Sequence, residues 1–511
     1  MILFPSCRLV VGLAVFALAA NLPASEPGYE VRDLLTAATP SDSRDKQWKP
    51  GGDIVLEISG MDWVGPDRLG VTLRKGDVYF IDDVLGADAK PVHFHRFASG
   101  LHEPLGLLKD GDSFLVTQRT EVTRLRDTDQ DGIADEYLTA ARGWNVSGNY
   151  HGYAYGPKRD KAGNLWITTN LDMGERAAND APWRGWALTL RPDGTLQPMA
   201  AGLRSPCGFG TNADGEMFVT DQQGTWVPAT PIHHLQKGAF FTNPEGIGSQ
   251  TLPDSPLNMP AKIADGIPYP EAIQRNPAMR PAAVWLPYNK MGRSGTDIVM
   301  IPEDGSFGPF EGQLLVGEFT NSAINRVFLE KVEGQYQGAC FPFLDGFPAA
   351  VVRLAFAPDG SLFVGMTNRG WSSLGARSYG LQRVRKSKSA PVPFAIRTLR
   401  ATPDGFALEF THPVDPTTVR APADLTMSRY TYLHSHAYGS DEIDTTQVPI
   451  ERTELSPDAK TLHLVAPQRK PLYVHELHFP LIRSARGDKL VYPVAYYTLN
   501  RIPSHSSSQL R

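Results

Sequence analysis

Six times along the chain, an apolar run, a polar turn and a second apolar run follow one another. The phrases read DWVGPDRLGV from Asp62, LGLLKDGDSFLV from Leu105, YAYGPKRDKAGNLWIT from Tyr153, GFGTNADGEMFV from Gly208, IVMIPEDGSFGPFEGQLLVG from Ile298 and AFAPDGSLFVGM from Ala355. Each phrase predicts a β-hairpin, because Asp, Asn and Gly in the turn tolerate the tight backbone geometry that joins two short strands.

The spacing of these hairpins indicates a repeat architecture. The turn glycines Gly111, Gly163, Gly215, Gly312 and Gly360 are 52, 52, 97 and 48 residues apart. A strand-rich repeat of about 50 residues is typical of a β-propeller, so we expect an all-β fold with a six-bladed β-propeller. The 97-residue gap is rich in proline, which central strands exclude, and this favours a long surface insertion over the alternative of a seventh blade.

Composition shifts divide the chain further. After the linker KSKSAPVP, alternating strand patterns with a turn about every ten residues predict a small Ig-like β-sandwich. The predicted organisation is a signal peptide at 1–24, an extended segment at 25–50, the six-bladed propeller at 51–388, the Ig-like β-sandwich at 389–502 and a polar tail at 503–511.

The N-terminus and the cysteines bear on location. Arg8, an apolar stretch of 12 residues and small residues before position 25 predict a secretory signal peptide, with an uncleaved anchor as the alternative. We therefore expect an exported protein, periplasmic or secreted, with no membrane span after signal removal. Cys207 and Cys340 remain in the mature chain and either form one disulfide or stay as two buried thiols.

Charge and motif content exclude some functions. The formal net charge is −5 and no basic stripe occurs, so we expect no nucleic-acid partner. No Cys-x-x-Cys-His sequence is present, so we expect no covalently attached haem.

The sharpest local motif is an acidic loop between the second and third repeats. Asp127, Asp129, Asp131 and Asp135 occupy positions 1, 3, 5 and 9 around Gly132, and Ile133 offers a backbone carbonyl. Hard oxygen ligands at alternate positions around a sharp turn favour a structural calcium site, which we expect to rigidify the channel face. Leu138 stands where an EF-hand has its bidentate Glu, and the alternative is a solvated acidic turn without metal.

Two side chains just before hairpins are candidates for chemistry. His151 precedes the third hairpin, at a blade end where propellers carry functional groups, and is either a proton acceptor or a structural histidine. Arg204 precedes the fourth hairpin, at a position equivalent to that of His151 before the third. Its fork of donors would bind a carboxylate or quinone oxygen, or form a salt bridge between blades.

The segments YHGYAYGPKRDKAGNLWITTN and GLRSPCGFGTNADGEMFVTDQQG resemble the sorbosone and glucose dehydrogenase-like propellers, which are soluble quinoproteins, over roughly residues 51–388. The sequences FEGQLLVGEFTNS, MTNRGW and YYTLNRIP resemble a secreted bacterial group of such propellers, often linked to cytochrome c modules. The resemblance implies PQQ as cofactor, His151 as general base, and Arg204, Ser205 and Arg353 as cofactor contacts. Ser205 stands where the family has Asn, and Thr320 lies near the position of its quinone-binding Lys.

The resemblance implies a dehydrogenase that oxidises a sugar or alcohol and passes the electrons to a separate cytochrome c-type acceptor. His151 would take the substrate's hydroxyl proton, and Arg204 would polarise the quinone or substrate oxygen. The sequence leaves two alternatives open: a non-catalytic propeller that binds carbohydrate or a protein partner, and a calcium-dependent lactone hydrolase.

Overall fold

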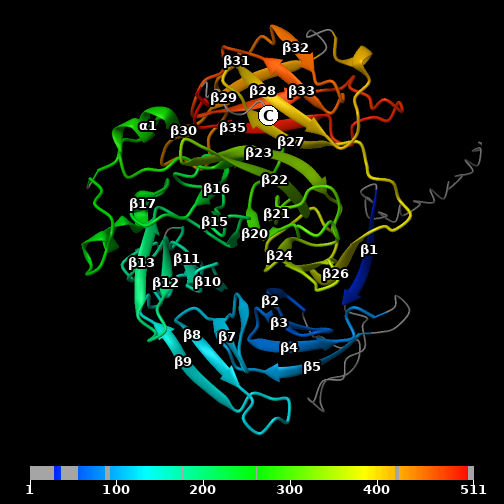
Figure 1. Cartoon of the computed structure of the whole chain (residues 1–511). Helices are drawn as coiled ribbons and strands as arrows, with labels where there is room; N and C mark the ends of the chain where they lie inside the picture. The colour runs from blue at the N-terminus through cyan, green and yellow to red at the C-terminus, as the bar shows by residue number, and fades with distance from the viewer. Residues whose placement is uncertain are drawn as a thin grey trace, which may run out of the picture.

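The fold is almost entirely β, as predicted, and six antiparallel sheets follow one another around a ring, each built on four strands and two of them extended by further strands (Figure 1). The computed structural model describes residues 28–35, 56–86, 92–174, 177–260, 262–420 and 425–504. The predicted signal peptide and most of the polar tail lie outside these residues. A ring of such sheets around a channel is the arrangement of a β-propeller.

Each repeated phrase forms the first two strands of one sheet, so the six hairpin predictions are confirmed. The first sheet contains β2 (Ile58–Gly65), β3 (Arg68–Leu73), β4 (Asp77–Asp82) and β5 (His93–Ala98), and the second contains β6 (Leu107–Asp110), β7 (Ser113–Thr117), β8 (Glu121–Arg126) and β9 (Glu136–Arg142). The third contains β10 (Ala154–Arg159), β11 (Leu165–Thr169), β12 (Trp186–Leu190) and β13 (Leu196–Ala201), and β17 (Ala239–Phe240) adds a fifth strand beside β13.

The next three sheets repeat this order. Their strands are β14 (Phe209–Thr211), β15 (Met217–Thr220), β16 (Thr230–His234) and β19 (Val284–Leu286); β20 (Gly295–Met300), β21 (Leu314–Glu318), β22 (Ala323–Val332) and β23 (Gln335–Leu344); and β24 (Val351–Phe356), β25 (Leu362–Thr367), β26 (Tyr379–Lys386) and β1 (Tyr29–Leu35). The first strand of each sheet lies toward the centre of the ring, and the fourth forms its rim (Figure 1).

Contacts between the first and last sheets, and a strand from the N-terminal segment, close the ring. β24 of the last sheet packs beside β2 of the first. The extended segment predicted before the propeller supplies β1, which pairs antiparallel with β26 from Tyr29↔Lys386 to Leu35↔Leu381. The last sheet is therefore completed by a strand that lies more than 300 residues away in the sequence, and the ring is fastened by backbone hydrogen bonds.

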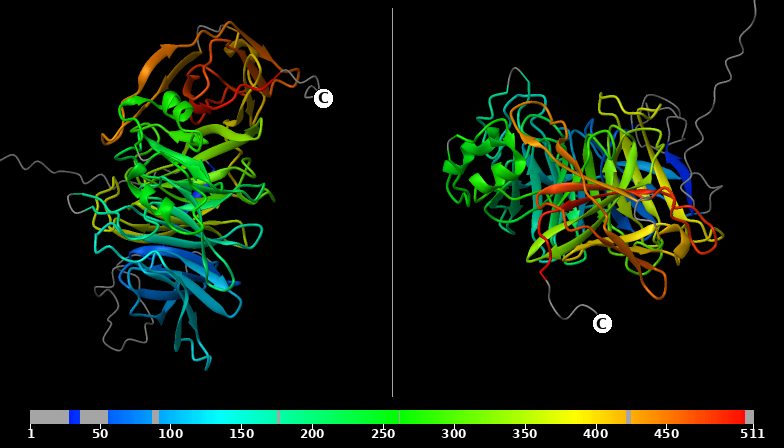
Figure 2. Two further views of the ribbon diagram at one scale, coloured as in Figure 1. Left: turned by 90° about the vertical axis from the view of Figure 1, so that its left-hand side faces the viewer. Right: turned by 90° about the horizontal axis from the view of Figure 1, so that it is seen from above.

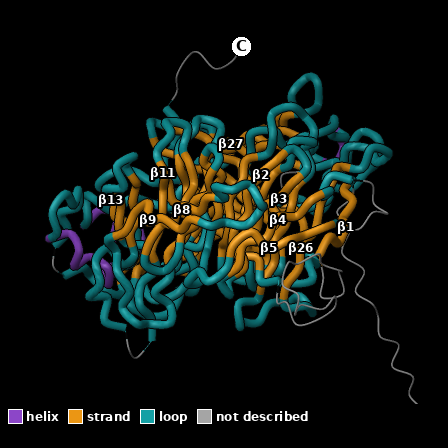
Figure 3. The backbone as a smooth tube through the Cα atoms, turned by 90° about the horizontal axis from the view of Figure 1, so that it is seen from below, coloured by secondary structure: helices purple, strands orange, loops and turns teal. Residues whose placement is uncertain are grey.

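Because each sheet is an antiparallel meander, its loops lie at two opposite ends of the ring; Figure 3 shows the loops and strands in a view from below. The turns between first and second strands and between third and fourth strands lie at one end. The loops between second and third strands, and the connections from one sheet to the next, lie at the other. We call the latter the loop end.

The long gap between the fourth and fifth phrases holds no further four-stranded sheet in the described residues. It contains η1 (Pro244–Thr251), β18 (Ile267–Pro268) and α1 (Tyr269–Arg275), between the third and fourth strands of the fourth sheet. The expectation of a purely superficial insertion was too simple, because Met259, Tyr269 and Met279 are buried in the largest apolar cluster. None of the described helices is long and apolar enough to cross a bilayer.

The C-terminal module is a β-sandwich that shares a sheet with the ring. One sheet contains β27 (Ile396–Ala401), β28 (Gly405–Phe410), β33 (Thr461–Val465) and β32 (Arg452–Leu455); the other contains β35 (Val494–Leu499), β34 (Tyr473–His478), β29 (Thr426–Thr431) and β31 (Ile443–Gln447). β35 also pairs with β23, so the second sheet continues the fifth sheet of the ring. Figure 2 shows these C-terminal strands stacked against the edge of the ring.

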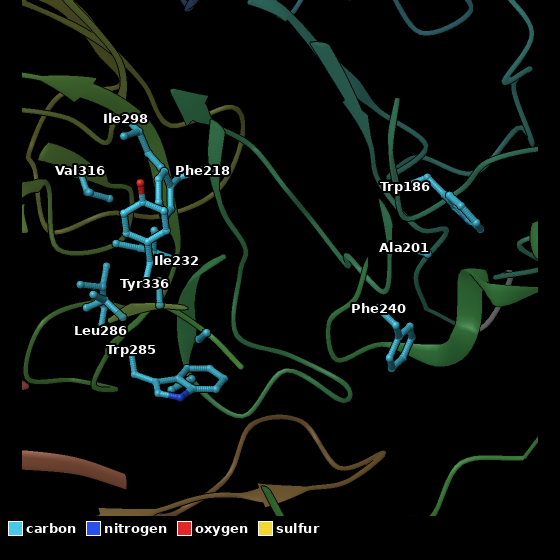
Figure 4. Close-up of a cluster of buried hydrophobic side chains, with 14 of the residues drawn as sticks. Trp186, Ala201, Phe218, Ile232, Phe240, Trp285, Leu286, Ile298, Val316 and Tyr336 are labelled. Atoms are coloured by element: carbon cyan, nitrogen blue, oxygen red, sulfur yellow. The ribbon is translucent and has the colours of Figure 1, made fainter. Parts of the chain in front are cut away.

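Aromatic and branched side chains fill the spaces between neighbouring sheets. Figure 4 shows Phe218 of the fourth sheet next to Tyr336 of the fifth, with ring centroids 5.1 Å apart, and Ile298 and Val316 nearby. Such inter-sheet packing fixes the sheets relative to one another, and with them the loops that they carry.

Candidate functional site

His151 lies at the loop end, in the connection from β9 to β10, and is half-buried. Its ring stacks on Trp371 of the β25–β26 loop, with centroids 5.7 Å apart and planes at 30°. Tyr150 contacts it edge-on at 5.2 Å. The pKa of His151 is lowered, first by burial and then by the positive charges of Arg204, Arg119 and Arg369. His151 is therefore neutral at pH 7 and able to accept a proton.

Arg204 and Ser205 lie at the same end, in the connection from β13 to β14. A single buried carboxylate holds their backbone, since Asp221 accepts from the Arg204 N–H at 2.7 Å and the Ser205 N–H at 2.6 Å. Burial raises the pKa of Asp221 to about 6. The Ser205 hydroxyl accepts from Asn170 at 3.1 Å. Sequence reasoning placed His151 and Arg204 in the same phase, and the structure brings them to one site.

Two further arginines complete the site, and sequence reasoning missed both. Arg119, in the β7–β8 loop, donates to the carbonyl oxygens of Asn149 at 3.0 Å and Tyr150 at 2.5 Å, and so holds the backbone before His151. Arg369, in the β25–β26 loop, lies 4.5 Å from the ring centroid of Tyr153. Its φ is +48°, a left-handed conformation that non-glycine residues rarely adopt and that often marks functional loops. Both arginines follow the second strand of a repeat, and this shared position is a sequence signal that would have identified them.

Several guanidinium nitrogens at this site have no hydrogen-bond partner. They are Nη1 of Arg204 and Nε and Nη2 of Arg369, in side chains that are each only 7% exposed. Burying a charged donor without an acceptor costs free energy, which a bound anion would recover. Arg204 and Arg369, close to a neutral histidine, therefore offer donors suited to carboxylate groups.

Arg353, also predicted as a cofactor contact, is placed differently. It lies on β24, and it donates to the carbonyl oxygens of Ser59 on β2 at 2.7 Å, and of Leu105 and Cys207, just before β6 and β14, at 3.0 Å and 3.2 Å. A further bond goes to the Val352 carbonyl at 2.8 Å. Its donors are thus used to tie innermost segments together around the channel, which is a structural role.

The acidic loop lies at the opposite end from His151. It joins β8 to β9 within the second sheet, so the expectation that it connects repeats and stiffens the channel face was wrong. Carboxylate oxygens of Asp127, Asp129 and Asp135 approach within 4.8 Å of one another, whereas Asp131 accepts from the Ile133 N–H at 2.8 Å. Glu136, the residue after the acidic loop, pairs with Arg126 at 2.8 Å.

The core settles the state of the two cysteines and contains a buried histidine. Cys207 and Cys340 are both free, buried thiols and not a disulfide. His233 is fully buried on β16 and stacks on Phe241 at 4.3 Å, and neither ring nitrogen has a hydrogen-bond partner. It is a core residue remote from proton exchange with solvent.

Comparison with known families places the chain. Residues 72–365, more than half of the sequence, match a family described as a domain of unknown function, DUF7133. The chain belongs to this family. The matched region runs from the end of β3 into β25 and includes Arg119, His151 and Arg204, whereas Arg369 lies just after it. No curated protein matches the sequence.

Solved structures of known proteins resemble the DUF7133 chain only distantly. A PQQ-bound aldose sugar dehydrogenase from Streptomyces coelicolor is 14% identical, with a TM-score of 0.48, over 71% of this chain and 99% of that one. A soluble aldose sugar dehydrogenase from Escherichia coli in the apo form is 13% identical, with a TM-score of 0.45, over 70% and 100%. A gluconolactonase-like protein is 14% identical, with a TM-score of 0.41, over 70% and 93%. At such scores the likeness carries no conclusion about activity.

Proposed function

We propose that this protein is an exported oxidoreductase that binds PQQ at the loop end and oxidises a sugar or related alcohol. The observation that carries the proposal is the set of buried, unpartnered guanidinium nitrogens of Arg204 and Arg369 beside a neutral His151. A ligand with several carboxylates satisfies such donors, and the predicted cofactor has three.

The residues present fit the cofactor better than the sequence pattern suggested. Arg353, whose donors are taken by carbonyls, drops out as a contact, but Arg369 and Arg119 add positive charge on two other sides of His151. Arg204, Arg369 and Ser205 would hold the carboxylate and quinone oxygens. The exposed ring of Trp371, already stacked on His151, offers an aromatic face to a planar ligand.

The chain's own part in the chemistry is proton transfer and orientation. Bound PQQ would supply the two-electron acceptor for the oxidation. An imidazole nitrogen of His151 accepts the proton of the substrate hydroxyl, and the lowered pKa keeps this nitrogen free at neutral pH. Arg119 fixes the Asn149–Tyr150 backbone and thereby the position of His151. The electrons leave to a separate carrier of the cytochrome c type.

Calorimetric titration of the mature protein with PQQ, followed by dye reduction with a panel of sugars, tests this proposal. We expect saturable binding that Arg369→Met weakens at least tenfold, and turnover that His151→Ala abolishes while binding persists. No saturable binding at tens of micromolar, or turnover that does not depend on His151, would overturn it. Binding without turnover would leave the alternative of a carbohydrate- or protein-binding propeller.

The lactone-hydrolase alternative depends on a metal held in the channel. The acidic group that the described residues bring within metal-binding distance is Asp127, Asp129 and Asp135, at the end opposite to His151. We propose that this loop binds calcium in a structural role, with the Ile133 carbonyl as a further ligand, and that it stabilises the rim of the second sheet.

The architecture that we infer has three further parts: the blades, the C-terminal module and the N-terminal segment. We infer that the six sheets count as six blades, closed by the β1–β26 pairing, and that the C-terminal sandwich is Ig-like. The segment 1–24 acts as a cleavable export signal, and the mature protein works in the periplasm or outside the cell.

A further inference from the structure

The C-terminal module reaches across to the candidate site through one loop. Residues 432–442, which include β30 (Leu433–His434), connect β29 to β31 and lie against the β15–β16 loop of the fourth sheet. The Trp226 N–H donates to the Ser435 carbonyl at 2.9 Å, and the Gly439 N–H donates to the Gly224 carbonyl at 3.0 Å. We call residues 432–442 the bridging loop.

Side-chain contacts hold the bridging loop from both sides. His434 is buried, lies within hydrogen-bond distance of the Thr242 carbonyl at 2.7 Å, and packs on Trp226 with ring centroids 4.9 Å apart. The inserted segment also pairs with it, because β18 and β30 form a two-stranded ladder at Ile267↔His434. The loop is therefore fixed to the ring, and its exposed side chains have defined positions.

The bridging loop places an open aromatic face over the candidate site. The Arg204 guanidinium carbon lies 5.3 Å from the centroid of the Tyr438 ring, and this tyrosine is 62% exposed. Polar groups lie close to the same arginine, because Glu245, at the start of η1, lies 3.7 Å from His436 and interacts with the charge of Arg204. An exposed aromatic face with a carboxylate and an imidazole near the same arginine suits a sugar ring, whose C–H face is apolar and whose hydroxyls need partners.

A second group of exposed aromatic side chains belongs to the site. Trp371, 49% exposed, and Tyr150, 51% exposed, lie against His151. Monomeric proteins rarely expose several large aromatic side chains on one face unless a ligand covers them. One surface lies against His151 and the other against Arg204, so a ligand that contacts both is longer than the sugar unit that reacts at His151.

We propose that the substrate is an oligosaccharide, and that Tyr438 and Glu245 form a sugar subsite contributed by the C-terminal module and the inserted segment. This inference rests on the proposed function for the reaction itself, but the subsite binds sugar without the cofactor. Tyr438 and Glu245 are positioning residues: they hold a sugar unit next to the one that reacts at His151.

Calorimetry on the full mature chain without PQQ tests the subsite. The probes are glucose, xylose and galacturonate, and the corresponding tetrasaccharides cellotetraose, xylotetraose and tetragalacturonate. We expect at least one tetrasaccharide to bind at least tenfold more tightly than its monosaccharide. Tyr438→Ala and Glu245→Gln should each remove most of this gain, whereas Tyr438→Phe, which keeps the ring, should retain it.

Tyr137→Ala is the matched control, because Tyr137 is a similarly exposed tyrosine on the rim strand β9. It should leave the preference for longer chains unchanged. Equal affinity for monosaccharide and tetrasaccharide in all three series, or a preference that survives in Tyr438→Ala, would overturn the proposal. Arg369→Met separates the two proposals, since it should lose PQQ binding and keep tetrasaccharide binding.

Discussion

Arg353 and Arg369 are both buried arginines near the channel, yet the structure predicts opposite consequences when each is replaced by methionine. Arg353 is 5% exposed and donates four hydrogen bonds to backbone carbonyls. Arg369 is 7% exposed and has two nitrogens without partners. Methionine keeps most of the aliphatic volume in both cases, so the comparison isolates the guanidinium group.

The magnitude for Arg353→Met follows from its hydrogen bonds. A bond from a charged donor contributes about 1.5–3 kcal/mol, so four contribute roughly 6–12 kcal/mol. Burying the guanidinium costs several kcal/mol, which the variant recovers. We therefore expect Arg353→Met to lower the free energy of unfolding by about 3–5 kcal/mol. Arg369→Met loses stacking on Tyr153 but removes unpartnered buried donors, so its stability should change by less than about 1 kcal/mol.

Urea unfolding, followed by tryptophan fluorescence, measures both variants against the unmodified protein. Arg353→Met should unfold at clearly lower urea, and the variant that remains folded in buffer should bind PQQ as before. Arg369→Met should keep its urea midpoint and lose PQQ affinity. The reasoning is refuted if the two variants are destabilised equally, or if Arg353→Met keeps its stability and loses binding.

Two further predictions concern other parts of the molecule. Removal of calcium with EGTA should lower the unfolding temperature, and Asp129→Asn should remove this calcium dependence; identical melting curves with calcium and EGTA would contradict the proposed ion site. His233→Phe should resist acid better than the unmodified protein. Burial lowers the pKa of His233 from 6.5 to about 3, so the folded state binds fewer protons than the unfolded state between these values. Stability is thus lost as the pH falls below 6.5, by up to about 5 kcal/mol, and the phenylalanine variant escapes this loss. Parallel curves of unfolding free energy against pH for His233→Phe and the unmodified protein would contradict this prediction.

The sequence by itself determined the local structure. Alternating apolar residues around Asp-Gly turns specify hairpins through contacts between near neighbours, so the all-β class, the repeat and the six hairpins could be read directly. The positions of His151 and Arg204 before successive hairpins also indicated that both side chains lie at one end of the ring. Periodicity carries this information because identical hairpins place equivalent residues at equivalent ends.

Only the tertiary structure decided what each side chain does there. Arg369 reaches the surroundings of His151 because the ring brings loops of the third and last sheets into contact at the loop end. Arg353 donates to carbonyls of three other inner segments of the ring. Tyr438 reaches Arg204 because β35 continues the fifth sheet and fixes the C-terminal module at the rim of the ring, from which the bridging loop extends to the β15–β16 loop. Such contacts join residues hundreds of positions apart, and no local pattern of hydrophobic and polar residues encodes them, because they depend on how whole sheets pack.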